Sequence, residues 1–78
     1  MFSVNIPFFE ALAFSQNGDF LFGGDKDGTV FKIDLVHGVE LTRKKVLKDQ
    51  ISSVLPLADD VHCIIAGSNQ PIVIEKID

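Results

Sequence analysis

The stretch from residue 11 to residue 35 limits most strongly what this chain can fold into. It contains three short apolar runs separated by two polar turns, which hold Asn17-Gly18 and Asp27-Gly28. Each run has about the length of one β-strand, and these dipeptides are favoured in type I′ hairpin turns, where both central residues need φ > 0. The stretch therefore predicts a three-stranded antiparallel meander.

The rest of the chain continues the same rhythm. Apolar and polar residues alternate over 2–6, and Phe20-Leu21-Phe22 indicates a strand covered on both faces. Residues 39–47 allow a strand or one short helix, and the lack of a cap and of a helical stripe favours a strand. The predicted strands are 2–6, 8–14, 19–23, 29–34, 39–47, 51–57, 62–67 and 72–77.

An internal repeat organises these strands. Ile33-Asp34 recurs as Ile77-Asp78, an offset of 44 residues, and Gly24 recurs as Gly67, an offset of 43. A period of about 40–45 residues with four strands per unit is typical of a β-propeller blade. The sequence thus predicts an all-β chain with two four-stranded antiparallel β-propeller blades, an incomplete propeller. Its repeats are residues 1–34 and 35–78, in one structural unit.

The first repeat resembles a Trp-Asp (WD) repeat over Ala-Phe-Ser-Gln-Asn-Gly-Asp, Gly-Gly-Asp-Lys-Asp-Gly-Thr-Val and a closing Ile-Asp. Gln16 stands where the family has proline, and Ile33 where it has tryptophan. The second repeat keeps the strand rhythm, Gly67 and the closing Asp78. The residues on family positions are Phe14, Ser15, Asn17, Gly18, Asp27, Gly28, Thr29 and Asp34.

The segment from Asp27 to Arg43 also resembles quinoprotein-type propeller repeats, with Thr42 in the place of their tryptophan. Two blades cannot close a ring, because propellers need about four to eight. Two stacked blades would leave two apolar outer faces, which mark contact surfaces. We therefore expect further blades, protein partners or copies of this chain to cover them.

Composition excludes several classes of protein. The 78 residues are 46% hydrophobic with a net charge of −4, which argues against general affinity for nucleic acid or an anionic membrane. The single cysteine, Cys63, permits no intrachain disulfide and no cysteine-rich zinc site. No apolar run approaches the roughly 18 residues of a membrane helix, and no basic residue precedes the first apolar ones. We expect a soluble cytoplasmic protein.

No motif indicates catalysis, a metal or a cofactor. The carboxylates of 25–29 resemble the start of a calcium loop, but Val36 stands where that loop needs a bidentate glutamate. His62 and Cys63 are adjacent in a strand and point to opposite faces, so they form no nucleophile pair. The basic run 43–45 is expected on a solvated outermost strand, where lysines discourage edge pairing. Asp59-Asp60 is expected in a turn.

Recognition is the function that remains. By resemblance to WD-repeat proteins, the loops between the second and third strands and those before the first strand form one rim that receives partners. We expect a non-enzymatic protein-interaction scaffold. The alternatives are a subunit that oligomerises into a closed propeller and binds a small ligand such as a sugar, and a fragment of a quinoprotein-like enzyme. The predicted partner-binding residues are Asp25, Lys26, Lys48, Asp49, Gln50, Asn69 and Gln70.

Overall fold

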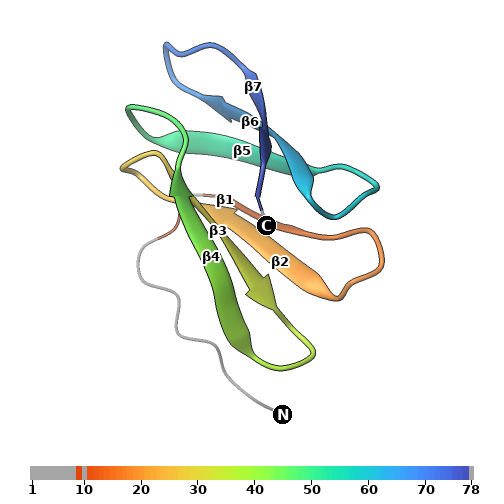
Figure 1. Ribbon diagram of the computed structural model, residues 1–78. Helices are drawn as coiled ribbons and strands as arrows, with labels where there is room; N and C mark the ends of the chain where they lie inside the picture. Colours follow the sequence, from red (N-terminus) through yellow and green to blue (C-terminus); the bar gives the residue numbers. More distant parts are fainter. Residues whose placement is uncertain (1–8, 10, 78) are drawn as a thin grey trace.

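The computed structural model describes residue 9 and residues 11–77, and these residues form strands and turns with no helix. The strands make two antiparallel sheets, so the all-β prediction is confirmed. Sheet A has the order β1-β2-β3-β4 and sheet B the order β5-β6-β7 (Figure 1). The strands are β1 (Ala11–Phe14), β2 (Phe20–Gly24), β3 (Thr29–Asp34), β4 (Val39–Lys45), β5 (Ile51–Pro56), β6 (His62–Gly67) and β7 (Val73–Lys76).

The division of strands between the sheets differs from the expected four and four. The strand expected at 39–47 is present as β4, but it pairs with β3 and so completes sheet A. Sheet B consequently has three strands among the described residues. The strand expected at 2–6 lies outside the described residues, and the one expected at 8–14 is described as a strand over Ala11–Phe14. The sheet boundary therefore falls after β4 and not after residue 34.

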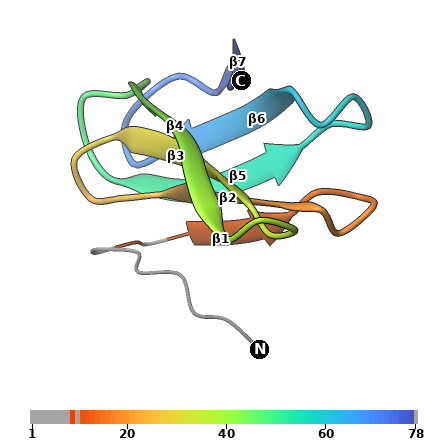
Figure 2. The same ribbon diagram turned by 60° about the horizontal axis from the view of Figure 1, so that its bottom comes forward.

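The sheets stack face to face, and β5 of sheet B lies beside β1 and β2 of sheet A (Figure 2). A hydrophobic core fills the space between them. Gly24 permits the close approach, because a Cβ there would lie 2.5 Å from Cγ2 of Ile51. The core residues, each at most 7% exposed, are Phe22, Val30, Leu47, Ile51, Val54, Cys63, Ile65 and Ile77.

The outer face of sheet A carries a second apolar cluster. The strand register places Leu21 opposite Ile33 on this face, whereas Phe22 lies opposite Lys32 on the inner face. Leu21, Phe31 and Ile33 are 8%, 2% and 1% exposed, and they pack with Leu35. The expectation that β2 is covered on both faces is confirmed.

The outer face of sheet B is open by comparison. Leu55 lies opposite Ile64, and Ile64 lies opposite Ile74, so one apolar row crosses all three strands. Leu55 is 58% exposed and Ile74 is 63% exposed, with Ile72 beside β7 at 70%. An apolar face of this kind usually marks a contact surface.

The first two hairpin turns of sheet A, which join β1 to β2 and β2 to β3, are not the type I′ turns that the sequence predicts. In each, the glycine N–H donates to the carbonyl three residues earlier, from Gly18 to Ser15 and from Gly28 to Asp25. Only the glycines have positive φ, at 80° and 87°. Serine or aspartate at the first turn position and glycine at the fourth is the preference of type I turns. Asn-Gly and Asp-Gly thus mark the turns correctly but not their type.

Candidate functional site

Three loops gather at one end of the stacked sheets: residues 25–28, 46–50 and 68–72, which we call the loop rim (Figure 1). Backbone hydrogen bonds join the first two loops, because Val46 and Leu47 donate to the carbonyl of Gly28 at 2.9 and 3.1 Å. Ile51 donates to the carbonyl of Asp25 at 3.0 Å. All seven residues predicted to bind partners lie in these three loops. Whether they bind a partner stays a prediction.

Gln70 joins the second and third loops. Its Oε1 accepts the backbone N–H groups of Lys48 and Asp49 at 2.8 and 3.1 Å. One side chain thereby holds the backbone of both residues in place and leaves their charged groups exposed. Its Nε2 is buried without a hydrogen-bond partner among the described residues.

Asp25 also has a structural role. Its Oδ1 accepts the backbone N–H groups of Asp27 and Thr29, both at 2.9 Å. These two bonds make residues 25–29 a short-range aspartate turn whose acceptor is Asp25. A carboxylate at the first turn position is closer to the N–H groups that the turn leaves unpaired.

A concavity with a volume of about 420 Å³ lies between the second and third loops. Ligand pockets usually span about 300–1,000 Å³, so the volume of this concavity lies near the lower end of that range. Lys48 is the charged residue in its wall, above an apolar floor. The lining residues are Val46, Leu47, Lys48, Asn69, Gln70, Pro71 and Val73.

The exposed residues of the loop rim carry charges of both signs. Lys26, Lys48, Asp49, Gln50 and Asn69 are exposed, whereas Asp25 and Gln70 are partly buried by the bonds described above. Asn69 has a φ of 57°, a left-handed conformation that asparagine tolerates better than most residues. The first five thus lie on the surface of the rim, and the last two shape it.

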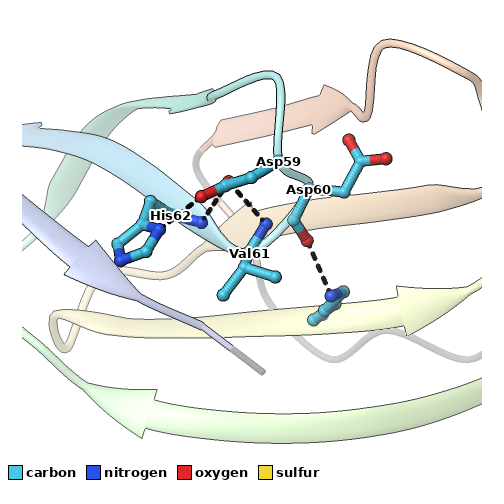
Figure 3. Close-up of polar contacts among 5 residues, drawn as sticks. Asp59, Asp60, Val61 and His62 are labelled. Atoms are coloured by element: carbon cyan, nitrogen blue, oxygen red, sulfur yellow. Dashed lines mark hydrogen bonds and ion pairs between the residues drawn. The ribbon is translucent and has the colours of Figure 1, made fainter.

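The opposite end holds two turns that both read Asp-x-Val-His, and in each the aspartate contacts the histidine, which was not predicted from the sequence. In one, Asp59 Oδ1 accepts the N–H groups of Val61 and His62, both at 2.9 Å, and Oδ2 lies 2.5 Å from Nδ1 of His62 (Figure 3). Asp34 makes the same contacts with Val36 and His37. The recurring tetrapeptide could have revealed these contacts.

The hydrogen bonds in these turns shift the carboxyl groups. The backbone N–H groups of His62 and Val61, followed by the His62 ring, hold the pKa of Asp59 well below its usual value. The His37 ring, and then backbone N–H groups, lower the pKa of Asp34. Both carboxylates stay ionised because every donor favours the charged form. The turns are thus rigid acceptors for their own histidines.

Lys32 is a buried cation between the sheets that the sequence analysis also missed. It is 6% exposed, and its Nζ donates to the backbone carbonyl of Asp60 at 2.8 Å. The same ammonium lies 4.3 Å from the ring centroid of Phe20 and 5.4 Å from that of Phe22. Aromatic faces attract cations at such distances. The lysine therefore fixes how sheet A sits against the β5–β6 turn of sheet B.

The remaining sequence expectations concern reactive groups. Cys63 is fully buried in the core, and burial raises the pKa of its thiol to about 11, so the thiol is unreactive. His62 is partly exposed beside it, as expected for opposite faces. Within residues 9 and 11–77, no three His, Cys, Asp or Glu side chains cluster as metal ligands, and no helix could cross a membrane.

The basic run of β4 lies on an edge of sheet A, as the sequence predicts. Arg43 pairs with Glu40 at 2.8 Å, and Lys44 pairs with Glu75 of sheet B at 3.0 Å. Lys45 donates to the carbonyl of Asp27. These cations have protein partners, which favours a structural role.

The geometry can be set beside known proteins. No protein-family model matches this chain, and a comparison with curated proteins finds no significant match.

Proposed function

We propose that this chain is a two-unit part of a WD-repeat-like β-propeller and serves as a non-enzymatic scaffold for protein interactions. The observation that carries the proposal is the convergence of all seven predicted residues at one end of two stacked antiparallel sheets. A surface of mixed charge with one small concavity suits protein contacts better than nucleic acid or a membrane. We place the scaffold in the cytoplasm as part of the same proposal.

The chemistry of the rim supports protein recognition. Lys48 and Asp49 present opposite charges side by side on a backbone that Gln70 fixes. Ordering such a loop in advance lowers the entropic cost of binding. The concavity beside Lys48 would receive a small apolar side chain, and the flanking charges would set orientation.

A pair of charge-swapped variants tests the proposal. Lys48→Glu with Asp49→Lys keeps the net charge and reverses the local pattern, while the backbone bonds to Gln70 remain possible. The matched control is Glu40→Arg with Arg43→Glu, which reverses an ion pair on β4. Proteins crosslinked to the wild-type chain in a cell extract should be lost with the rim swap and kept with the control. Capture of the same proteins by both variants would contradict the proposal.

The open face of sheet B favours a second candidate, a subunit that assembles with copies of itself into a closed propeller. The small ligand expected for it, such as a sugar, stays a prediction, as does the quinoprotein-like enzyme. The chain has no Trp or Tyr, the side chains that sugar sites of this kind generally use. A closed oligomer of fixed mass that binds a sugar would favour this candidate over the scaffold.

A further inference from the structure

One oxygen atom in the loop rim accepts two successive backbone N–H groups. Oε1 of Gln70 lies 2.8 Å from the nitrogen of Lys48 and 3.1 Å from the nitrogen of Asp49. Neighbouring N–H groups that converge on one point form a nest, a backbone arrangement that binds anionic oxygen atoms. The amide oxygen of Gln70 is neutral, so in this structure the nest holds a weaker acceptor than a charged oxygen would be.

Further donors surround this nest. Lys48 adds an exposed ammonium to the wall of the concavity. Nε2 of Gln70 is buried and has no hydrogen-bond partner among the described residues. The carboxylate of Asp49 is exposed, where water and salt screen its charge. Ammonium and amide N–H groups donate but do not accept, so the site favours a ligand that brings two acceptor oxygens, as a carboxylate does.

The apolar floor of the concavity restricts the ligand further. It is formed by Val46, Leu47, Pro71 and Val73, next to the polar groups of Lys48 and Gln70. A ligand that fills it therefore needs an apolar branch beside its carboxylate. The C-terminal residue of a polypeptide has this shape, because its side chain and its carboxylate leave the same Cα atom. The side-chain carboxylates of aspartate and glutamate, by contrast, end an unbranched stem.

We propose that the loop rim binds the C-terminal carboxylate of a partner polypeptide, and that Oε1 of Gln70 occupies its place in the free chain. The inference rests on the proposed function, because it names the part of a protein partner that the rim recognises. One carboxylate oxygen takes the N–H groups of Lys48 and Asp49, and the other faces the ammonium of Lys48. The last side chain of the partner enters the concavity. The displaced amide of Gln70 turns outward, where water accepts from its Nε2.

This exchange of acceptors is favourable because of charge. Two hydrogen bonds to a neutral amide oxygen are replaced by two to a carboxylate, and bonds with a charged partner are about twice as strong. The buried Nε2 also gains a partner when the side chain of Gln70 leaves. Until then Gln70 keeps both N–H groups oriented, which lowers the cost of ordering the loop on binding.

Two peptides that differ in one group test the inference. A pentapeptide of four glycines and a C-terminal valine carries the free carboxylate, and the same peptide with a terminal carboxamide is the control. In an NMR titration of the full chain, the free form should shift the backbone amides of Lys48 and Asp49. It should also speed the exchange of the Gln70 side-chain amide with water. The carboxamide should bind about tenfold more weakly or less well still, and equal affinities would overturn the inference.

Two variants with the same added charge separate occupation of the nest from general repulsion. Gln70→Glu places a carboxylate on the two N–H groups from within the chain, so it should weaken binding of the free peptide by about tenfold or more. Asn69→Asp adds the charge to the neighbouring residue while Gln70 stays in the nest, and aspartate tolerates the left-handed φ of 57°. Its loss should be about threefold or less. Equal losses for the two variants would overturn the inference.

Two further measurements identify the source of the carboxylate and separate this inference from the proposed function. Isovalerate, a free branched carboxylate, should bind several-fold more weakly than the peptide, and equal binding would overturn the assignment to a polypeptide end. A chain that binds neither peptide but still loses its crosslinked proteins with the rim swap would overturn only this inference. A chain that binds the free peptide but keeps all its crosslinked proteins with the rim swap would contradict the proposed function and leave the carboxylate site standing.

Discussion

Sheet A and sheet B are built from similar hairpins but differ in how far the apolar side chains of their outer faces are exposed. In sheet A the outer cluster of Leu21, Phe31 and Ile33 is buried, and polar β4 closes the edge. In sheet B the outer row through Leu55 and Ile74 is exposed. The difference teaches that the same strand rhythm can bury an outer apolar cluster on one sheet and leave an outer apolar row exposed on the other.

The largest expected effect tests this contrast directly. Ile33→Lys places a charge at a position that is 1% exposed and should destabilise the chain by about 4 kcal/mol or more. Ile74→Lys is the matched substitution on sheet B, and it should change the free energy of unfolding by less than about 0.5 kcal/mol, because Ile74 is 63% exposed. Urea titration at low protein concentration measures both. Equal losses would show that the outer faces do not differ.

A second comparison uses the turn glycines. Gly28→Ala forces a Cβ at φ 87° into the carbonyl of Leu47 and should cost more than about 2 kcal/mol, because the chain must move where the loops meet. Gly18 has a similar φ of 80° but nothing lies within 4 Å of an added Cβ, so Gly18→Ala should cost about 1 kcal/mol. Thermal unfolding ranks the two. A ranking in the reverse order would refute the role of Gly28 in joining sheet A to the rim.

The buried lysine gives a smaller effect. Lys32→Met keeps the long stem but removes the cation, its bond to Asp60 and its contacts with two rings. Because removing a buried charge offsets the lost interactions, the free energy of unfolding should change by about 1 kcal/mol or less. A loss above 3 kcal/mol in urea titration would mean that the Lys32–Asp60 contact is the main link between the sheets.

The smallest effect is in the pH dependence. In the folded chain the pKa values of Asp34 and Asp59 lie below the ordinary aspartate value of 3.8, so the unfolded chain binds more protons near that pH and stability falls as the pH drops through 3.8. Asp59→Asn should flatten this acid slope more than Asp34→Asn, because the Asp59 shift is the larger. Denaturation at a series of pH values from 6 down to about 2 measures the slopes. If neither variant changes the slope, neither turn is the source of the loss of stability at low pH.

Local patterns predicted the strands well. The boundaries of β3 and β6 are those expected from the sequence, because alternation and flanking turn residues are encoded within each segment. The edge position of β4 also followed from its lysines. The sheet to which β4 belongs was predicted wrongly. Pairing depends on which neighbour a strand meets, and the tripeptide of residues 36–38 is compatible with β4 in the first sheet or in the second.

The candidate site was also predicted only in part. Turn residues indicated the loops of the rim, and the structure brings those loops together. The roles of Gln70 and Lys32 could not be predicted, since their partners Lys48, Asp49 and Asp60 are more than twenty residues away. A lysine at an alternating position looks solvent-facing unless the second sheet above it is known. The turn at Asp59-Asp60 was predicted, but the tetrapeptide Asp-x-Val-His that it shares with residues 34–37, and the contact from aspartate to histidine in both, were overlooked.

The fully buried thiol of Cys63 can report how often the two sheets separate. Alkylating reagents attack thiolates, and a side chain that is 0% exposed can be reached only when the sheets part. The rate at which iodoacetamide labels native protein therefore reports how often the stack opens, without any added probe. A neighbour that seals sheet B from outside would slow that labelling without touching the cysteine.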